Sequence, residues 1–598
     1  MTDLLRIGGA CGFWGESPQA TGQLLAVPGL NVLVYDYLAE ITMSIMARAR
    51  QKDPGAGYAS DFVTEAMAPN LARIAKGGVK VLSNAGGMNP GACAEALRAI
   101  IAKAGLGLKV AVVEGDDLLP RVADYADMTE MFSGAPMPPA DKIVSMNAYL
   151  GAVPVAAALL AGADIVITGR CADSALTLGA CMAHFGWGRD DLDLLAAGSL
   201  AGHLIECGPQ ATGGNFTDWQ QAGDIAGIGY PVVEIAEDGG FAVTKPAGTA
   251  GLVTPATVGE QMLYEIGDPR AYLLPDVICD FTDVTLTQAG PDRVHVAGAR
   301  GRAPSGQLKV SVTWADGWRA GHVMFFNGQG ATAKARAYAD TVLGRARAKL
   351  AAMGAPDYRE TCVETFGGRP GDGPFEEIAL KAAVRHDDPR AVGLFLREAV
   401  GAGLATPPGL HFFTGGGRPK PSPVVALFSC LVDACDPDVR LTLDGQTVPY
   451  APSRRPVAEA GALPFAPEPE PPATDGRDMV LRPLEALAWA RSGDKGDAAN
   501  IGVMARHAAY LPWIWAALTP EAVAQVFAAE SAGRIDRFAL PGIGALNILM
   551  HNALGGGGVA SLRNDAQAKS FAQRLLALPV PVPADLIVNS EISEGEGA

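Results

Sequence analysis

The sequence predicts an α/β protein with a mainly parallel sheet in the N-terminal region, a β-rich middle region and a small ferredoxin-like α+β domain at the C-terminus. The first observation behind this is an alternation of apolar strand-like runs with helix-length segments over residues 4–220. Near-continuous Val, Ile and Leu runs are typical of strands covered on both faces, as in a parallel sheet between helices. These runs are Leu4–Ala10, Asn31–Tyr35, Val79–Ser83, Leu108–Val113 and Asp164–Thr168.

The second observation is a change of pattern after residue 230. Short β-branched runs split by Gly, Pro and Asp predict antiparallel strands. They lie at Val243, Val277–Phe281, Val294–Ala297, Leu308–Trp314 and His322–Phe326. Helical segments return at Ala331–Ala352 and Asp388–Gly403.

The third observation is the order of elements after a Pro-rich stretch. Residues 479–582 follow the order strand, polar turn, strand, helix (Leu511–Ala529), strand (Ile535–Leu540), Gly-rich loop and helix (Asp565–Leu576). We therefore expect four parts: an α/β domain with the proposed pocket over 1–229, a β-rich and helical part over 230–451, a linker over 452–478, and the ferredoxin-like domain over 479–585.

Composition limits the class of protein. A chain of 598 residues is too long for a single core, and its net charge of −17 argues against nucleic acid or an anionic membrane surface as the main partner. Nine scattered cysteines without a CxxC pair are typical of a reduced, cytoplasmic protein. No apolar run is long enough to span a bilayer, so we expect a soluble protein. Because the chain is highly apolar and carries a linked accessory domain, we expect a homo-oligomer rather than a monomer.

Polar residues follow four of the predicted parallel strands. Ligands of open parallel sheets bind beyond the carboxyl ends of the strands, so these residues are expected to line one pocket. Carboxylates would serve as acid or base, and amide, guanidinium and backbone N–H groups would hold an anion. The catalytic candidates are Asp36, Glu114, Arg170 and Asp173, and the binding candidates are Asn84, Gly86, Gly87 and Asn89. The alternative is that Asn89, Asp116 and Asp173 are only helix caps.

Two further stretches are rich in glycine and polar residues. Thr212-Gly213-Gly214-Asn215 is predicted to wrap a phosphate or carboxylate with backbone N–H groups. The neighbouring Cys207 would be a nucleophile in one interpretation and a small buried apolar residue in the other.

The segment Ser492-Gly-Asp-Lys-Gly-Asp497 packs two acids, a cation and two glycines into six residues. We expect Ser492, Asp494, Lys495 and Asp497 to face the main pocket and to complete it. The alternative is a solvated hairpin turn, since Gly and Asp are common turn residues.

Together these stretches resemble the acyclic terpene utilisation (AtuA-like) family over residues 4–450. The resemblance rests on five segments, and the segment Arg491–Asp497 is similar to the ferredoxin-like domain of longer members. The five segments are Asp36–Glu40, Ser83–Pro90, Thr168–Ser174, Glu206–Asn215 and Glu265–Tyr272. The family name implies the breakdown of citronellol- and geraniol-type acids through CoA esters, but it defines no reaction and no catalytic residues.

Three functions remain open. The first is a lyase or hydro-lyase acting on a branched carboxylated acid or its acyl-CoA thioester, with CoA as part of the substrate. Mg²⁺ would be held by Asp36, Glu114 or Asp173, or by Asp494 and Asp497, because hard oxygen ligands suit this ion. The second is a non-catalytic subunit that binds an acyl-CoA or organises a partner enzyme.

The third function is an NAD(P)-dependent oxidoreductase. Its support is the glycine-rich segment Gly8–Gly12 after the first strand and Asp36 after the second, an order found in dinucleotide-binding domains. However, the glycine spacing is not GxGxxG, and Phe13 and Trp14 crowd the position of the phosphates.

Overall fold

A computed structural model describes residues 4–368, 376–413, 419–450, 464–474, 476–558 and 560–586. The chain forms two compact units. The first comprises Met1–Val312, Phe428–Ala553 and Ala568–Ala598, and the second comprises Thr313–Leu427 and Leu554–Gln567. These units do not coincide with the predicted boundaries, because segments distant in sequence share a core.

The first unit contains an eleven-stranded sheet. Its centre is parallel, in the order β1-β2-β3-β6-β4, and the pairs β1–β2, β2–β3, β3–β6 and β4–β6 all run in one direction. These strands are β1 (Leu4–Cys11), β2 (Val32–Tyr35), β3 (Lys80–Ser83), β4 (Val110–Glu114) and β6 (Ile165–Thr168). All five predicted N-terminal strands are therefore present.

Antiparallel strands extend this sheet at both ends, so the sheet is mixed and the prediction of a mainly parallel sheet holds for its centre alone. Four strands of the region predicted to be a separate β-rich part instead continue the N-terminal sheet beyond β1, where β7 pairs with β1 and β8 pairs with β7. Two further strands, β19 and β20, extend the sheet beyond β4. The added strands are β7 (Val232–Ala236), β8 (Phe241–Thr244), β11 (Thr285–Gly290), β12 (Arg293–Ala297), β19 (Arg440–Leu443) and β20 (Gln446–Val448).

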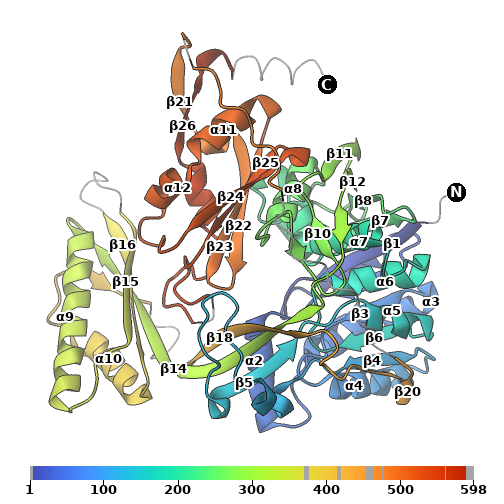
Figure 1. Ribbon diagram of the computed structural model, residues 1–598. Helices are drawn as coiled ribbons and strands as arrows, with labels where there is room; N and C mark the ends of the chain where they lie inside the picture. The colour runs from blue at the N-terminus through green and yellow to red at the C-terminus, as the bar shows by residue number, and fades with distance from the viewer. Residues whose placement is uncertain are drawn as a thin grey trace. The chain divides into compact units, whose positions relative to one another are not determined.

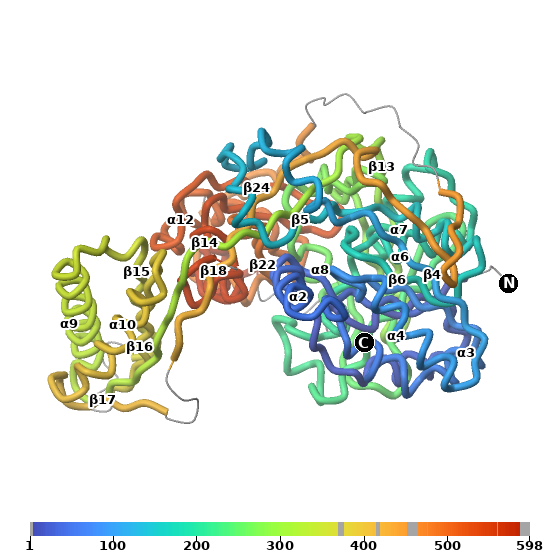
Figure 2. Tube along the Cα trace, turned by 90° about the horizontal axis from the view of Figure 1, so that it is seen from below, coloured from blue at the N-terminus to red at the C-terminus, as the bar shows by residue number. Residues whose placement is uncertain are grey.

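Helices cover both faces of the parallel strands (Figure 2). One face carries a core to which Met46, Phe62, Leu97 and Ile167 contribute, because alternate strand residues point to the same side. The helices on this face are α1 (Gln19–Leu24), α2 (Glu40–Lys52), α3 (Leu71–Gly77) and α4 (Pro90–Lys103). The other face is covered by α5 (Val153–Leu160), α6 (Ala175–Phe185) and α7 (Leu192–Ile205).

The longest strand is β14 (Gln307–Asn327), which joins the two predicted runs 308–314 and 322–326. It pairs with β5 (Ile143–Ala148) and β18 (Ser422–Asp433). The sequence did not predict β5, because its Ser and Asn residues interrupt the apolar pattern. A three-stranded sheet in the first unit is formed by β9 (Tyr272–Leu273), β10 (Ile278–Asp280) and β13 (Arg300–Arg302).

The second unit is a sheet with two helices packed on one face (Figure 1). Its core includes Phe326, Tyr338, Val342 and Phe395. The two predicted helices are present as α9 (Ala331–Ala352) and α10 (Pro389–Gly401). The remaining strands are β15 (Glu360–Gly367), β16 (Glu377–His386) and β17 (Leu410–His411).

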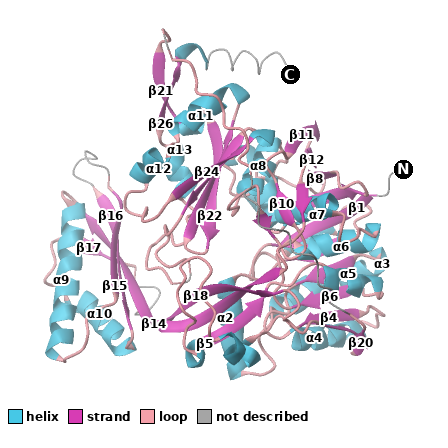
Figure 3. Ribbon diagram, viewed as in Figure 1, coloured by secondary structure: helices cyan, strands magenta, loops and turns pink. Residues whose placement is uncertain are grey.

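Apart from residues 554–567, the C-terminal domain belongs to the first unit, and it contains a four-stranded antiparallel sheet in the order β22-β23-β25-β24. Three helices cover one face of this sheet and α8 (Pro255–Leu263) packs on the other (Figure 3). The strands are β22 (Ala488–Lys495), β23 (Ala498–Ala505), β24 (Ile535–Leu540) and β25 (Ala545–Met550), and the helices are α11 (Leu511–Ala517), α12 (Pro520–Val526) and α13 (Phe571–Leu576). A separate ribbon pairs β21 (Met479–Pro483) with β26 (Pro579–Pro583).

The single helix predicted over 511–529 is two helices, because Pro520 cannot continue α11 and instead begins α12. Strand β25 was missing from the prediction. Within the described ranges, no helix is both long and apolar enough to cross a membrane.

Candidate functional site

Asp36, Asn84 and Arg170 lie together beyond the carboxyl ends of β2, β3 and β6. The Asn84 side-chain amide donates to Asp36 Oδ1 at 2.5 Å, and its carbonyl oxygen accepts the Tyr37 N–H at 2.7 Å. Parallel strands bring these loops to one edge of the sheet. The sequence therefore placed these three side chains correctly relative to one another.

Arg170 is the central cation of this edge, with 4% of its side chain exposed. One of its Nη atoms donates to the Leu38 carbonyl at 2.9 Å and to Asp173 Oδ1 at 2.7 Å. The buried Asp116 carboxylate accepts the Arg170 backbone N–H at 2.8 Å and so holds the loop. Arg170 Nε is buried and has no hydrogen-bond partner among the described residues.

Three residues that the sequence did not single out as site candidates complete the surroundings of Arg170. The Tyr149 ring contacts two cations: its centre is 4.1 Å from the Arg170 guanidinium carbon and 4.8 Å from Lys309 Nζ. Glu40 accepts the Tyr149 hydroxyl at 2.6 Å and Lys309 Nζ at 3.3 Å. About a third of the Lys309 side chain is exposed. Tyr149 and Lys309 lie on or next to β5 and β14, which join the edge through tertiary pairing.

The carboxyl groups of this edge differ in protonation. Burial and repulsion from Asp173 raise the pKa of Asp36 well above its usual value, although Arg170 and Asn84 act in the opposite direction. Burial would also raise the pKa of Glu40, but Lys309 and Arg170 outweigh it and hold this pKa well below its usual range. One carboxyl group therefore favours its neutral form and the other its charged form, which is the division of roles that acid–base chemistry needs.

A buried His–Glu pair lies within electrostatic range of Asp36. His203 Nδ1 is 2.9 Å from Glu206 Oε1, and His203 Nε2 is 3.2 Å from the Met262 carbonyl oxygen. Burial would lower the pKa of His203, but Glu206 raises it, whereas burial raises the pKa of Glu206. The protonation of each member of this pair therefore depends on that of the other.

Cys207 does not have the surroundings of a nucleophile. Burial and the nearby Glu206 carboxylate raise the pKa of its thiol well above the usual value. A thiolate is the reactive form of cysteine, so this position favours an inert thiol.

The β22–β23 hairpin brings two charged side chains to the same region. Lys495 Nζ lies 5.3 Å from the centre of the Tyr272 ring and within electrostatic range of His203 and Glu206. Burial and Glu265 raise the pKa of the neighbouring Asp494 to about 7. The hairpin therefore contributes ionisable groups to the surroundings of the pair His203–Glu206, and completion of the main pocket by this turn stays a prediction.

Lys569 joins the hairpin to the segment after α8. Its Nζ atom is 3.2 Å from Glu265 Oε1 and 3.8 Å from Asp494 Oδ1, and it contacts the Tyr264 hydroxyl. Buried Arg491 donates to the Asn215 carbonyl at 2.6 Å and also contacts Gln210 Oε1. These polar interactions join the hairpin to residues 210–265 within the first unit.

Two hairpin candidates have structural contacts. The Ser492 hydroxyl donates to the Ala568 carbonyl at 2.6 Å and accepts the Ala572 N–H at 2.8 Å, and so anchors α13. The Asp497 carbonyl accepts the Ala553 N–H at 2.9 Å. Substrate binding by these two residues stays a prediction, and the contacts of Ser492 weigh against it.

Several N-terminal candidates also have structural contacts. Asn89 caps α4, because its Oδ1 accepts the Ala92 N–H at 3.4 Å. Gly87 has a φ of +50°, and a side chain on it would collide with Met46. Gly86 packs against the Thr168 carbonyl in the same way.

Glu114 ends β4 at the predicted edge. Its carboxylate lies beside the first turn of α4, where a Cβ atom on Gly91 would be 3.6 Å from Glu114 Oε1. No hydrogen bond or ion pair joins Glu114 to Asp36 or Arg170 in the described chain. A catalytic role for Glu114 therefore stays a prediction.

The two glycine-rich loops use their N–H groups internally. Gly213 and Gly214 both donate to the Pro209 carbonyl, and the Thr212 hydroxyl donates to the Gly229 carbonyl at 2.6 Å. Anion binding by Thr212–Asn215 stays a prediction, and these contacts weigh against it. In the other loop, which follows β1, the Glu16 carboxylate accepts the Gly12 N–H at 2.6 Å, and this disfavours a phosphate at that point.

A metal ion has little support from the arrangement of ligands. Across the residues that the structure describes, no three His, Cys, Asp or Glu side chains are grouped so that they could hold one ion. Mg²⁺ therefore stays a prediction from the sequence.

Two cavities lie apart from this ionic region. The first unit has one of about 250 Å³, whose walls include the apolar Leu150 and Leu308 and the charged Arg189, Asp276 and Asp433. The two leucines directly neighbour Tyr149 and Lys309, and successive side chains of extended chain point to opposite sides. The cavity therefore lies behind the wall that carries Tyr149 and Lys309.

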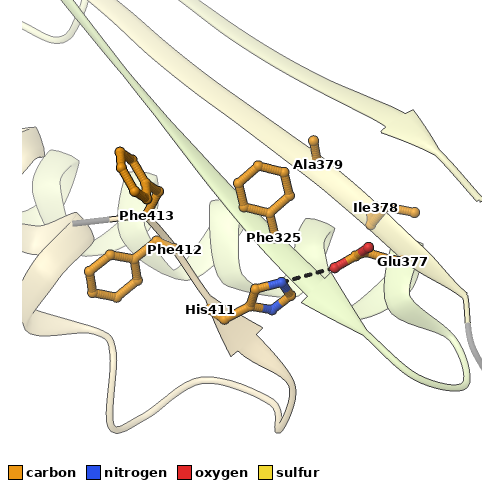
Figure 4. Close-up of a pocket in the computed structure, with 7 residues that line it drawn as sticks. All are labelled: Phe325, Glu377, Ile378, Ala379, His411, Phe412 and Phe413. Carbon is orange, nitrogen blue, oxygen red and sulfur yellow. Dashed lines mark hydrogen bonds and ion pairs between the residues drawn. The ribbon is translucent and has the colours of Figure 1, made fainter. Parts of the chain in front are cut away.

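The second unit has an open groove of about 510 Å³. Figure 4 shows three phenylalanine rings and the pair His411–Glu377, whose Nε2 and Oε1 atoms are 3.0 Å apart. This lining contains one acid paired with one histidine and lacks the opposed acids and cations found around Arg170. We therefore take the groups around Arg170 as the candidate site.

Comparison with known families gives two matches. The description "Acyclic terpene utilisation family protein AtuA" applies to residues 5–443, and "AtuA ferredoxin-like domain" applies to residues 482–581. Searches of curated proteins and of solved structures found no match. The two family matches cover most of the chain and confirm the resemblance, so the chain belongs to the acyclic terpene utilisation family, with its ferredoxin-like domain at the C-terminus.

Proposed function

We propose that this protein is an enzyme of acyclic terpenoid breakdown, a lyase or hydro-lyase that acts on a branched carboxylated acid or its CoA thioester. One observation carries this proposal. Asp36, a carboxyl group that favours its neutral form, lies near the ion pair of Arg170 and Asp173. Addition or removal of water next to a carbonyl group needs one acid, one base and a donor for the developing oxyanion.

Each of these roles has a suitable group. In the hydration direction, the Asp173 carboxylate takes a proton from water, and the oxygen of that water bonds to the β-carbon of an unsaturated acyl group. Asp36 then donates its proton to the α-carbon, so water is added and no redox partner is needed. Arg170 Nε, a buried donor without a partner among the described residues, suits the carbonyl oxygen whose charge increases during the reaction.

Exchange of solvent atoms tests this proposal across a set of candidate substrates. The protein is incubated with branched α,β-unsaturated acids and their CoA thioesters in ²H₂O and in H₂¹⁸O, and mass spectrometry measures incorporation. We expect incorporation into one substrate class, and Asp36→Asn should slow it by roughly 10²–10⁴-fold, the usual size of acid–base effects.

A matched control is Asp164→Asn. Asp164 precedes β6 and so lies at the end of the parallel strands opposite to Asp36, where it pairs with Lys80 at 2.7 Å. This variant should keep wild-type exchange rates. Unchanged exchange in Asp36→Asn would refute the acid role. Tight binding of a CoA thioester without any exchange would instead favour the non-catalytic binding subunit.

A further inference from the structure

We propose that Lys495, on the C-terminal domain, binds a free carboxylate group of the substrate, so that this site selects acids with an unesterified carboxylate. The inference rests on the proposed function, because it takes the groups around Arg170 and His203 as the substrate site. It goes further in naming the substrate class and the residue of the ferredoxin-like domain that recognises it.

The basic groups of this region differ in their partners. Most have a carboxylate oxygen within 4 Å: Arg170 has Asp173 at 2.7 Å, Lys309 has Glu40 at 3.3 Å, Lys569 has Glu265 at 3.2 Å and His203 has Glu206 at 2.9 Å.

Arg491 has no such carboxylate, but it is buried and donates to the oxygens of Asn215 and Gln210. Lys495 differs from all of these, because its ammonium group forms no ion pair or hydrogen bond with any described residue. Its positive charge is therefore available to a ligand.

The surroundings of Lys495 suit an anionic ligand. The side chain is exposed, and its ammonium group lies 5.3 Å from the centre of the Tyr272 ring, which holds a cation without neutralising it. The protein has a net charge of −17, so an anion can be held here only by local positive charge.

The number of available charges indicates the class of anion. One ammonium group matches one carboxylate, whereas the phosphate groups of CoA carry several charges and would need several cations at the same place. The basic side chains near Lys495 are already paired. A free carboxylate therefore fits this position better than the phosphates of a CoA thioester, which would have to lie elsewhere.

A binding experiment with two matched ligands isolates this charge. Calorimetry measures the dissociation constants of 3-methylbut-2-enoate and of its neutral methyl ester for the wild-type protein and for Lys495→Met. Methionine keeps most of the length and the apolar stem of lysine while removing the charge. We expect the variant to bind the acid about tenfold more weakly and the ester unchanged, as for loss of one hydrogen bond to a charged group.

The control variant is Arg482→Met. Arg482 is an exposed cation on β21 of the same domain, so this change alters the net charge equally and should leave the affinity for the acid unchanged. An equal loss of affinity for acid and ester, an equal effect of Arg482→Met, or no binding of the acid by the wild-type protein would each overturn the proposal.

The test separates this inference from the proposed function. Asp36→Asn should bind the acid with an affinity close to that of the wild type, because it removes the proton donor and leaves Lys495 in place. If exchange depends on Asp36 while Lys495→Met binds the acid normally, the carboxylate assignment fails and the enzymatic proposal stands. If Lys495 selects the acid but no exchange occurs in any substrate, the enzymatic proposal fails and the site is a carboxylate-binding site.

Discussion

Replacing Arg170 with leucine should destabilise the protein strongly at neutral pH. The guanidinium group, with 4% of its side chain exposed, compensates the carboxylates of Asp173 and Glu40 and donates to the Leu38 carbonyl. Removing one partner of a buried ion pair typically costs about 3–5 kcal/mol, because the remaining charge is left without compensation. Arg170→Lys keeps the charge but loses the planar stacking on Tyr149, so we expect it to cost less.

The pH dependence separates charge from packing in this prediction. Arg170 helps to hold the pKa of Glu40 below its usual value, so this carboxylate stabilises the wild type above the unfolded-state pKa, and the stabilisation is lost as the pH falls towards the folded-state pKa. The cost of Arg170→Leu should therefore be largest at pH 7 and smaller at about pH 3, below the unfolded-state pKa of glutamate near 4.3. Urea denaturation followed by tryptophan fluorescence measures both values. Equal costs at the two pH values would show that Arg170 acts through packing, and a cost below about 1 kcal/mol at pH 7 would refute its central role.

Three further outcomes are expected. Burial raises the pKa of Asp116 to about 7. Its contribution to stability is therefore complete below the unfolded-state pKa near 4 and is lost as the pH rises through 7. Asp116→Asn should flatten the profile of unfolding free energy between pH 5 and 8 by up to about 4 kcal/mol, as measured by urea titrations at each pH. Gly502→Val should lower the melting temperature, because a Cβ atom at this position would lie 2.3 Å from the Leu263 Cβ atom; wild-type stability would contradict the close packing of β23 on α8. Iodoacetamide at pH 7.5 should label Cys207 slowly, and Cys207→Ser should retain solvent exchange; rapid labelling would contradict the thiol pKa raised by burial and Glu206.

Local sequence determined the central strands and several of the candidate residues. The five N-terminal strands are read from continuous apolar runs, because strands covered on both faces tolerate few polar residues. Helices α9 and α10 follow from their periodicity, and the cap of α4 follows from the dipeptide Asn89-Pro90. The convergence of Asp36, Asn84 and Arg170 follows from the rule that parallel strands end at one edge.

Other parts of the site depend on contacts between distant segments. Tyr149 and Lys309 carry no local signal, and they meet Glu40 because β5 pairs with β14. The ionisation of Asp36 is also decided by tertiary structure, because a pKa depends on burial and on charges that distant segments bring near.

The sequence by itself determined the family, the strands of the sheet centre and the residue types at its edge, because these depend on local pattern and on short motifs. Only the tertiary structure decided that β7, β8, β11 and β12 extend the first sheet and that the strands of the C-terminal domain pack on α8. It also decided which cations are neutralised by neighbours and that, among the described residues, Lys495 is not. Pairing between open strand edges and between charges is set by proximity in space, and no local pattern encodes it.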